Sequence, residues 1–205
     1  MDVPVLYLIR HGRTELNQNN CFRGNMDVPL SPEGIEDGKE ASKFLESLDA
    51  KPVFIISSDK KRAVKTADIL SEDFDAPVKE VHQLRALNVG KFSGQPRNEE
   101  NIKELQTYIN EPDTSIPDGE SLNEFKERVI PVLEEAFELA CDNGLGLIVC
   151  HSSIIHEVGT QLYGDHTSLV VEPGGVVVVG FEDGKPSAKS IFKKYKPDGN
   201  TASIS

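Results

Sequence analysis

The chain of 205 residues has little cysteine, few basic residues and no long apolar runs. Its three cysteines form neither a paired framework nor a CxxC motif, which favours a reducing, cytoplasmic location over a secreted one. No apolar run approaches the roughly 20 residues that a membrane-spanning helix needs. The segment that starts at Met1 lacks the basic region and the small-residue cleavage site of a signal peptide. We therefore expect a cytoplasmic protein with no membrane partner.

Positive charge is scarce. Lys and Arg number 22 against 34 Asp and Glu, which gives a formal net charge of −12. An acidic chain is repelled by nucleic acid and by anionic membrane surfaces, so neither is expected as the main partner. An anionic substrate must then be held by cations that are gathered in one place.

What the sequence does contain is an alternation of short apolar runs and amphipathic stretches. Continuous apolar runs are typical of strands buried on both faces, and they predict strands near residues 5–9, 53–56, 78–81, 145–150, 176–179 and 189–192. Amphipathic helices are predicted between them. This order predicts a single α/β domain over residues 1–205, a three-layer α/β/α sandwich around a mostly parallel sheet. A small cap is expected at about 85–118 and a frayed tail at 196–205.

Cationic side chains follow three of these strands where each strand ends. Arg10-His11 follows the first, Arg62 lies shortly after the second, and His151-Ser152 follows the strand at 145–150. Ligands of such sheets bind beyond the carboxyl ends of the strands. Arginine forks fit phosphate oxygens, a neutral histidine can attack phosphorus, and a helix that starts at Ser152 also favours an anion. The sequence therefore predicts a cationic phosphate pocket.

The residues Arg10-His11-Gly12-Arg13-Thr14-Glu15, with Asn17, resemble the signature of the histidine phosphatase superfamily, which includes the cofactor-dependent phosphoglycerate mutases. The similarity continues through Phe22-Arg23-Gly24, Asp27-Val28-Pro29-Leu30-Ser31, Ser57-Ser58-Asp59 with Arg62, Gly119-Glu120-Ser121 and Val149-Cys150-His151.

This resemblance implies a phosphoglycerate mutase-like fold in which His11 is the phosphorylated nucleophile. It further implies roles for the other matched residues. Those that hold and stabilise the phosphoryl group would be Arg10, Arg62 and His151, assisted by Asn17. Those that line the substrate side would be Thr14, Arg23 and Gly24. The resemblance implies neither a metal nor a cofactor.

One position departs from the family pattern. The segment 84–90 resembles one in which the family has a glutamate at the third position, acting as general acid and base, and here that position is Ala86. An alanine cannot move a proton. Either another carboxylate substitutes for the glutamate, or the chemistry needs none. Glu120 is the first candidate, and the weaker ones are Asp118, Glu99 and Glu100.

The leading functional prediction is metal-independent hydrolysis of a small phosphomonoester through a phosphohistidine on His11. A mutase is the enzymatic alternative. It is disfavoured because mutases that resemble this family carry a longer and more basic insertion, whereas the bases within 85–118 are only Arg85, Lys91, Arg97 and Lys103. The rival from another class is a catalytically weak binder of phosphorylated ligands, which kept the cationic pocket and lost the acid.

Overall fold

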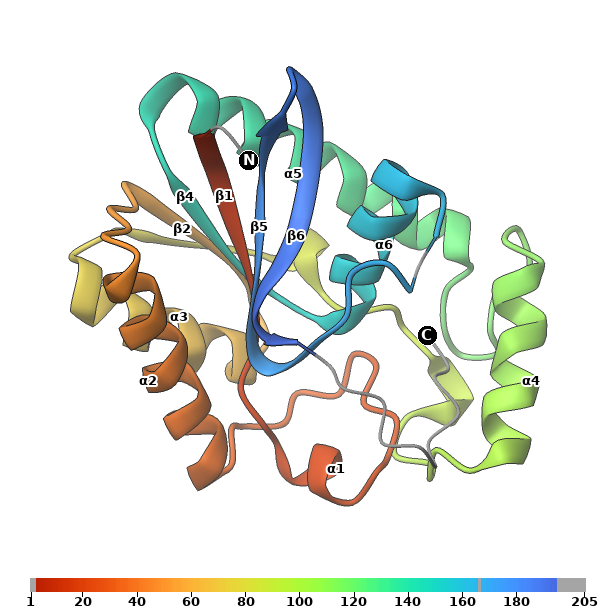
Figure 1. Cartoon of the computed structure of the whole chain (residues 1–205). Coiled ribbons are helices and arrows are strands. Elements are labelled where there is room, and N and C mark those ends of the chain that lie inside the picture. The colour runs from red at the N-terminus through yellow and green to blue at the C-terminus, as the bar shows by residue number, and fades with distance from the viewer. Residues whose placement is uncertain (1–2, 166, 195–205) are drawn as a thin grey trace.

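The computed structural model describes residues 3–165 and 167–194, which form a six-stranded sheet between helices (Figure 1). The strands are β1 (Val3–Arg10), β2 (Phe54–Ser58), β3 (Val78–Val81), β4 (Gly146–Cys150), β5 (Val171–Glu182) and β6 (Lys185–Lys194). The helices are α1 (Glu15–Gln18), α2 (Pro32–Ser47), α3 (Lys61–Phe74), α4 (Glu99–Asn110), α5 (Leu122–Asn143) and α6 (Ser152–Tyr163), with 3-10 turns at His82–Leu84 and Gly90–Phe92.

The sheet is mostly parallel, as predicted. Its strand order is β3-β2-β4-β1-β5-β6, and β3, β2, β4 and β1 pair in parallel. The last two strands form an antiparallel hairpin beside β1. In the central pair Arg10 lies opposite Cys150, so β1 and β4 end at the same level. The residues that follow them therefore meet at one edge of the sheet.

Helices cover both faces of the sheet, which confirms the three-layer sandwich (Figure 1). Alternate residues of β1 point to opposite layers because side chains alternate along a strand. Tyr7 and Ile9 pack in the core beneath α2 and α3, whereas Leu6 and Leu8 pack in the core beneath α5 and α6. Two separate cores thus fix β1 in the middle of the molecule, and with it the position of His11.

The C-terminal hairpin is longer than the sequence predicts. The expected strands were 176–179 and 189–192, but β5 begins at Val171 and β6 runs from Lys185 to Lys194. A Gly-Gly pair such as Gly174-Gly175 is typical of a turn, yet both glycines lie within β5. The register shifts between Val171 and Val176, and Gly174 has a φ of +74°. An irregularity of this kind needs additional residues on one strand and a glycine conformation, and it does not end the strand.

The segment predicted as a cap, 85–118, holds the turn at Gly90–Phe92 and helix α4. It is anchored by Phe92 and Ile116, which are each 2% exposed. Helix α4 itself contains no fully buried residue, and its apolar side chains are half-buried. The tail predicted at 196–205 lies outside the described residues. Within 3–165 and 167–194, we find no helix with both the length and the apolar character that crossing a membrane requires.

Candidate active site

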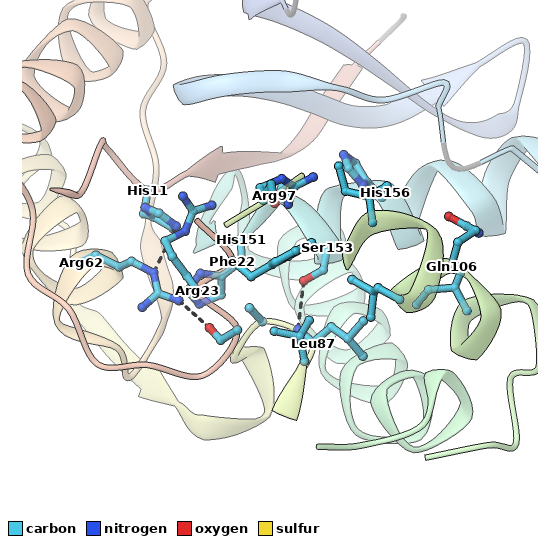
Figure 2. Close-up of a pocket in the computed structure, with 17 residues that line it drawn as sticks. His11, Phe22, Arg23, Arg62, Leu87, Arg97, Gln106, His151, Ser153 and His156 are labelled. Carbon is cyan, nitrogen blue, oxygen red and sulfur yellow. Dashed lines mark hydrogen bonds between the residues drawn. The ribbon is translucent and has the colours of Figure 1, made fainter. Parts of the chain in front are cut away.

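A pocket of about 170 Å³ lies beyond the ends of β1 and β4 (Figure 2). Six of the nine predicted site residues line it, namely His11, Arg23, Gly24, Arg62, His151 and Ser152. His11, Arg62 and His151 are each only 1% exposed, so they form its floor. The structure therefore brings together groups from the ends of two strands and from helix α3, as the strand-end argument predicted.

His11 is held in one tautomer by contacts on both ring nitrogens. Its Nδ1 lies 2.7 Å from the carbonyl oxygen of Gly12, and only an N–H can make that contact. The proton is therefore on Nδ1, and Nε2 keeps its lone pair, which accepts a hydrogen bond from Arg62 Nε at 3.2 Å. Burial, and next the charge of Arg62, lower the pKa of His11 well below its usual value. The imidazole is neutral at pH 7 and thus nucleophilic.

Arg62 connects His11 to the loop that follows α1. It lies in the first turn of α3, and burial lowers its pKa to about 10. Its Nη1 donates to the carbonyl oxygen of Met26 at 2.6 Å and its Nη2 to that of Gly24 at 3.1 Å. The guanidinium plane is fixed by these contacts, because three separate donors are aligned at once. Arg62 therefore sets the position of the loop that carries Arg23.

His151 is the N-cap of α6 and faces His11, with the two ring centroids 5.1 Å apart. Its Nε2 lies 2.9 Å from Ser58 Oγ, and that oxygen already accepts a hydrogen bond from the N–H of Lys60. The Ser58 hydroxyl proton is thus best directed at Nε2, which leaves the histidine proton on Nδ1. This buried Nδ1 finds no partner among the described residues. It is suited to donate to a phosphoryl oxygen.

Further arginines surround these groups. Arg10 donates Nη1 to the carbonyl oxygen of Val171 at 2.7 Å, and its buried Nε finds no partner in the described part of the chain. Burial lowers the pKa of Arg10 to about 10. Burial, and then the charges of Arg10, Arg62 and Arg97, lower the pKa of Arg23. Arg97 lies over the ring of Phe22 at 4.8 Å. This concentration of cations is relieved when a dianion binds.

Thr14 and Asn17, predicted on the substrate side and in phosphoryl binding, lie outside the pocket lining. The backbone N–H and the Oγ1 of Thr14 both donate to Asn17 Oδ1 at 3.0 Å, which caps the short helix α1. Arg13 points away as well and binds Asp37 through Nε at 2.8 Å. Contact of Thr14 and Asn17 with the substrate stays a prediction.

The structure contradicts the hypothesis that Glu120 replaces the missing glutamate. One of its carboxylate oxygens accepts from the N–H of Asn88 at 2.7 Å and from Arg128 Nη2 at 2.6 Å, and the other accepts from Arg128 Nε at 2.9 Å. The other candidates do not line the pocket either, and the lining contains no Asp or Glu among the described residues. Ala86 does line it. The position of Glu120 in the sequence does not indicate that Arg128 binds both of its carboxylate oxygens.

Arg128 holds the backbone that carries Ala86. It donates to the carbonyl oxygens of Gln83, Arg85 and Ala86 in addition to Glu120. We expect Arg128→Met to lower the free energy of unfolding by about 3 kcal/mol, because several partly buried acceptors lose their donors together. Urea unfolding measures the change. The matched variant Arg85→Met removes a more exposed pair with Asp59 and should lower it by about 1 kcal/mol or less. Equal losses would contradict this account.

The two buried histidines also predict a dependence of stability on pH. Burial lowers the pKa of both His11 and His151 well below the unfolded value. Below about pH 6.5 the unfolded chain therefore binds protons that the folded chain does not, so stability falls as the pH falls. Between pH 7.5 and 5.5 we expect a loss of about 2–3 kcal/mol in urea unfolding.

His11→Asn removes one of the two groups and should halve that loss, whereas His82→Asn, at an exposed histidine, should leave it unchanged. The ionised carboxylates do not interfere, because the pKa values of Asp37 and Asp59 are lowered from values that are already acidic. A pH dependence that is the same in all three proteins would show that the histidines are not its source.

Several lining residues were not predicted. Arg97, Gln106 and His156 complete the polar part of the pocket, and a wall of apolar side chains consists of Phe22, Leu87, Val89, Ile102, Leu105 and Ile109. The spacing of Ile102, Leu105 and Ile109 indicates one face of a helix, but the sequence does not say where that face points. Among the described residues no three His, Cys, Asp or Glu side chains are grouped as a metal site.

Comparison with known proteins agrees with this geometry. The family model for the histidine phosphatase superfamily (branch 1) matches residues 6–194. The chain is 30% identical over 167 residues to the uncharacterized phosphatase PhoE of Bacillus subtilis, covering 82% of this chain and 81% of that protein. A phosphoglycerate mutase from Bacillus anthracis is 27% identical, with a TM-score of 0.75 and 91% of each chain covered. The α-ribazole phosphatase of Shigella flexneri shares the fold, with a TM-score of 0.76 and 22% identity. The match covers 92% of this chain and 96% of that protein. The chain belongs to the histidine phosphatase superfamily, branch 1.

Proposed function

We propose that the chain hydrolyses a small phosphomonoester through a phosphohistidine on His11. The observation that carries this proposal is the environment of His11 Nε2. Its lone pair faces a buried pocket, the proton is fixed on Nδ1 by the carbonyl oxygen of Gly12, and Arg62 lies at hydrogen-bond distance. A neutral histidine nucleophile beside buried arginines is suited to attack phosphorus and poorly suited to any chemistry on a cationic or neutral substrate.

In the first step His11 Nε2 attacks phosphorus in line, the N–P bond forms and the bond to the ester oxygen breaks. Arg62 Nε donates to a phosphoryl oxygen in place of Nε2, while Nη1 and Nη2 keep their contacts with Met26 and Gly24. Arg10 Nε and the Arg23 guanidinium neutralise charge on the other oxygens, and His151 Nδ1 donates to the oxygen in which charge develops. In the second step water attacks phosphorus, the N–P bond breaks and phosphate leaves.

The relatives support hydrolysis as the outcome. One is named a phosphatase in Bacillus subtilis, and another is named a putative phosphoserine phosphatase in Hydrogenobacter thermophilus. Relatives named as probable mutases also match, over 65% of this chain. We favour hydrolysis because the cap has few bases to hold a second phosphate. A reducing, cytoplasmic location is proposed with it, supported by three cysteines that form no disulfide in the described structure.

A rapid acid or alkali quench with a phosphate-labelled aryl ester tests the proposal. Single-turnover mixing of the parent protein should trap label that is stable to alkali and labile to acid, the behaviour of a phosphoramidate on histidine. Peptide mapping should place it on His11, and His11→Asn should trap none. Binding of the ester without any trapped label would instead identify the chain as a binder of phosphorylated ligands, which agrees with a pocket lining that holds no carboxylate among the described residues.

A further inference from the structure

We propose that Asp37 is a positioning residue for His11, because its carboxylate fixes and polarises the peptide group that holds the Nδ1 proton of the imidazole. This inference rests on the proposed function, in which His11 forms a phosphohistidine. Its basis is the peptide group between Gly12 and Arg13. The carbonyl oxygen of this peptide, which belongs to Gly12, accepts from His11 Nδ1 at 2.7 Å. The N–H of the same peptide, which belongs to Arg13, donates to Asp37 Oδ2 at 2.9 Å.

These two hydrogen bonds lie in series. A trans peptide group is planar, and its N–H and its C=O point in opposite directions. The carboxylate on one side and the imidazole on the other are thus joined through a single peptide. A rotation of this peptide would break both contacts. The carboxylate that holds the N–H therefore also fixes the carbonyl oxygen to which His11 Nδ1 donates.

The carboxylate of Asp37 is itself held at both of its oxygens. Arg13 donates Nε to Oδ2 at 2.8 Å and Nη2 to Oδ1 at 3.0 Å, and Lys193 donates Nζ to Oδ1 at 2.6 Å. The side chain of Asp37 is only 2% exposed. Burial raises its pKa, but the hydrogen bonds from Arg13 and Lys193 outweigh burial and hold the pKa of Asp37 below its usual value. The group is therefore an anion at neutral pH and acts as an acceptor only.

The backbone of Asp37 is fixed as well. Helix α2 packs here against the irregular part of β5, where a Cβ on Gly174 would lie 2.7 Å from the carbonyl oxygen of Asp37. The N–H of Gly174 also donates to the carbonyl oxygen of His11 at 3.3 Å. The close approach of this glycine thus brings β5, α2 and His11 into contact at one point. A carboxylate on so rigid a support can fix the position of a second group.

The charge of Asp37 acts on His11 through this peptide. An ionised acceptor binds an N–H more strongly than a neutral one, and it pushes electron density towards the carbonyl oxygen of the same peptide. The hydrogen bond from His11 Nδ1 to that oxygen becomes stronger in turn. When Nε2 bonds phosphorus, the P–O bond breaks and its electron pair leaves with the ester oxygen, while Nδ1 keeps its proton. The ring is then cationic, and a more negative carbonyl oxygen stabilises that charge.

The test measures phosphorylation of His11 in single turnovers with a labelled aryl phosphate. Asp37→Asn keeps the size of the side chain and removes its charge. It should lower the rate of phosphorylation by about 10–10²-fold, the loss typical of groups that orient a metal-bound histidine through its other ring nitrogen. The affinity for inorganic phosphate in calorimetry should stay within about threefold of the parent, because the arginines of the pocket are unchanged.

The proton resonance of His11 Nδ1–H separates positioning from a purely structural tie between α2 and the loop after β1. A stronger hydrogen bond moves an N–H resonance downfield, and His11→Asn identifies the signal by its loss. Asp37→Asn should move the signal upfield. Lys193→Met should move it downfield, because the carboxylate loses a cation at Oδ1 and becomes a stronger acceptor for the peptide N–H. A structural loosening would instead shift the signal upfield in both variants.

Asp73→Asn is the matched control. Asp73 accepts from Ser42 Oγ at 2.5 Å and so joins α3 to α2, and its variant should match the parent in rate and in resonance. A rate for Asp37→Asn within about threefold of the parent, or an upfield shift in Lys193→Met, would overturn the inference while labelled His11 still upheld the proposed function. If Asp37→Asn does not fold, the direction of the shift in Lys193→Met decides alone. Failure of the parent to label His11 would overturn the proposed function itself.

Discussion

His11→Asn is expected to reduce turnover of every phosphomonoester by at least about 10³-fold, since removal of an activated nucleophile closes the covalent path. Asparagine has similar bulk, and its amide N–H can still donate to the carbonyl oxygen of Gly12, which now accepts from His11 Nδ1 at 2.7 Å. The arginines and His151 remain in place. Steady-state assays with an aryl phosphate measure the loss.

The variant should retain the affinity of the parent for inorganic phosphate in calorimetry, because the cations that hold the anion are unchanged. This retained binding separates a chemical defect from a structural one. If His11→Asn keeps activity within about tenfold of the parent, equivalent to ~1.4 kcal/mol, a phosphohistidine on this residue is not the intermediate.

Gly12→Ala is expected to lower the free energy of unfolding by about 4 kcal/mol or more and to abolish activity. A Cβ on Gly12 would lie 2.1 Å from the carbonyl oxygen of Gly34, a backbone atom at the start of α2 that cannot rotate away. The φ angle of Gly12 is not in the left-handed region, so the cause is contact alone. The displaced loop would also break the hydrogen bond from the N–H of Gly12 to Thr66 and move the carbonyl oxygen that orients His11.

Thermal and urea unfolding measure this effect. Gly34→Ala should be equally damaging, because its Cβ would lie 2.0 Å from the carbonyl oxygen of Arg13. Gly184→Ala is the control. That glycine has a φ of +73° but no atom within 4 Å of the added Cβ, so only backbone strain of about 1–2 kcal/mol is expected. Comparable losses at Gly12 and Gly184 would show that the loop can adapt to the contact.

The local pattern of apolar runs in the sequence predicts much of this fold and of the site. The apolar runs at 5–9 and 145–150 predict buried parallel strands, and parallel strands bring their carboxyl ends together, so His11 and His151 could be paired from sequence alone. The same argument predicts that Arg62 lies at this edge of the sheet, since it follows β2 closely and lies in the first turn of a helix. The family motif then assigned the nucleophile.

Features that depend on the path of a loop could not be predicted. Glycines at 174 and 175 indicate a turn, and only pairing with β1 and β6 shows that they form a bulge inside a strand. The sequence leaves the carboxylate of Glu120 as a candidate proton donor. In the structure Arg128, eight residues along the chain, binds both of its oxygens. His156 carries no distinguishing signal in the sequence. Whether it lines the pocket depends on where α4 and residues 86–89 close that pocket, and no periodicity encodes that.

The strand order also constrains how the protein is made. Strand β1, which leads to His11, is translated before the other strands of the sheet, yet both strands that flank it come much later, with Leu6 beside Gly146 and Leu8 beside Val177. Until those residues leave the ribosome, the apolar segment at 5–9 has no partner, whereas β2, α3 and β3 can already associate with one another. Pairing between segments so distant in the chain is slow to form. His11 is thus synthesised before its surroundings and reaches its final position only when nearly all of the sheet exists, so we expect nascent chains to depend on a chaperone that shields β1.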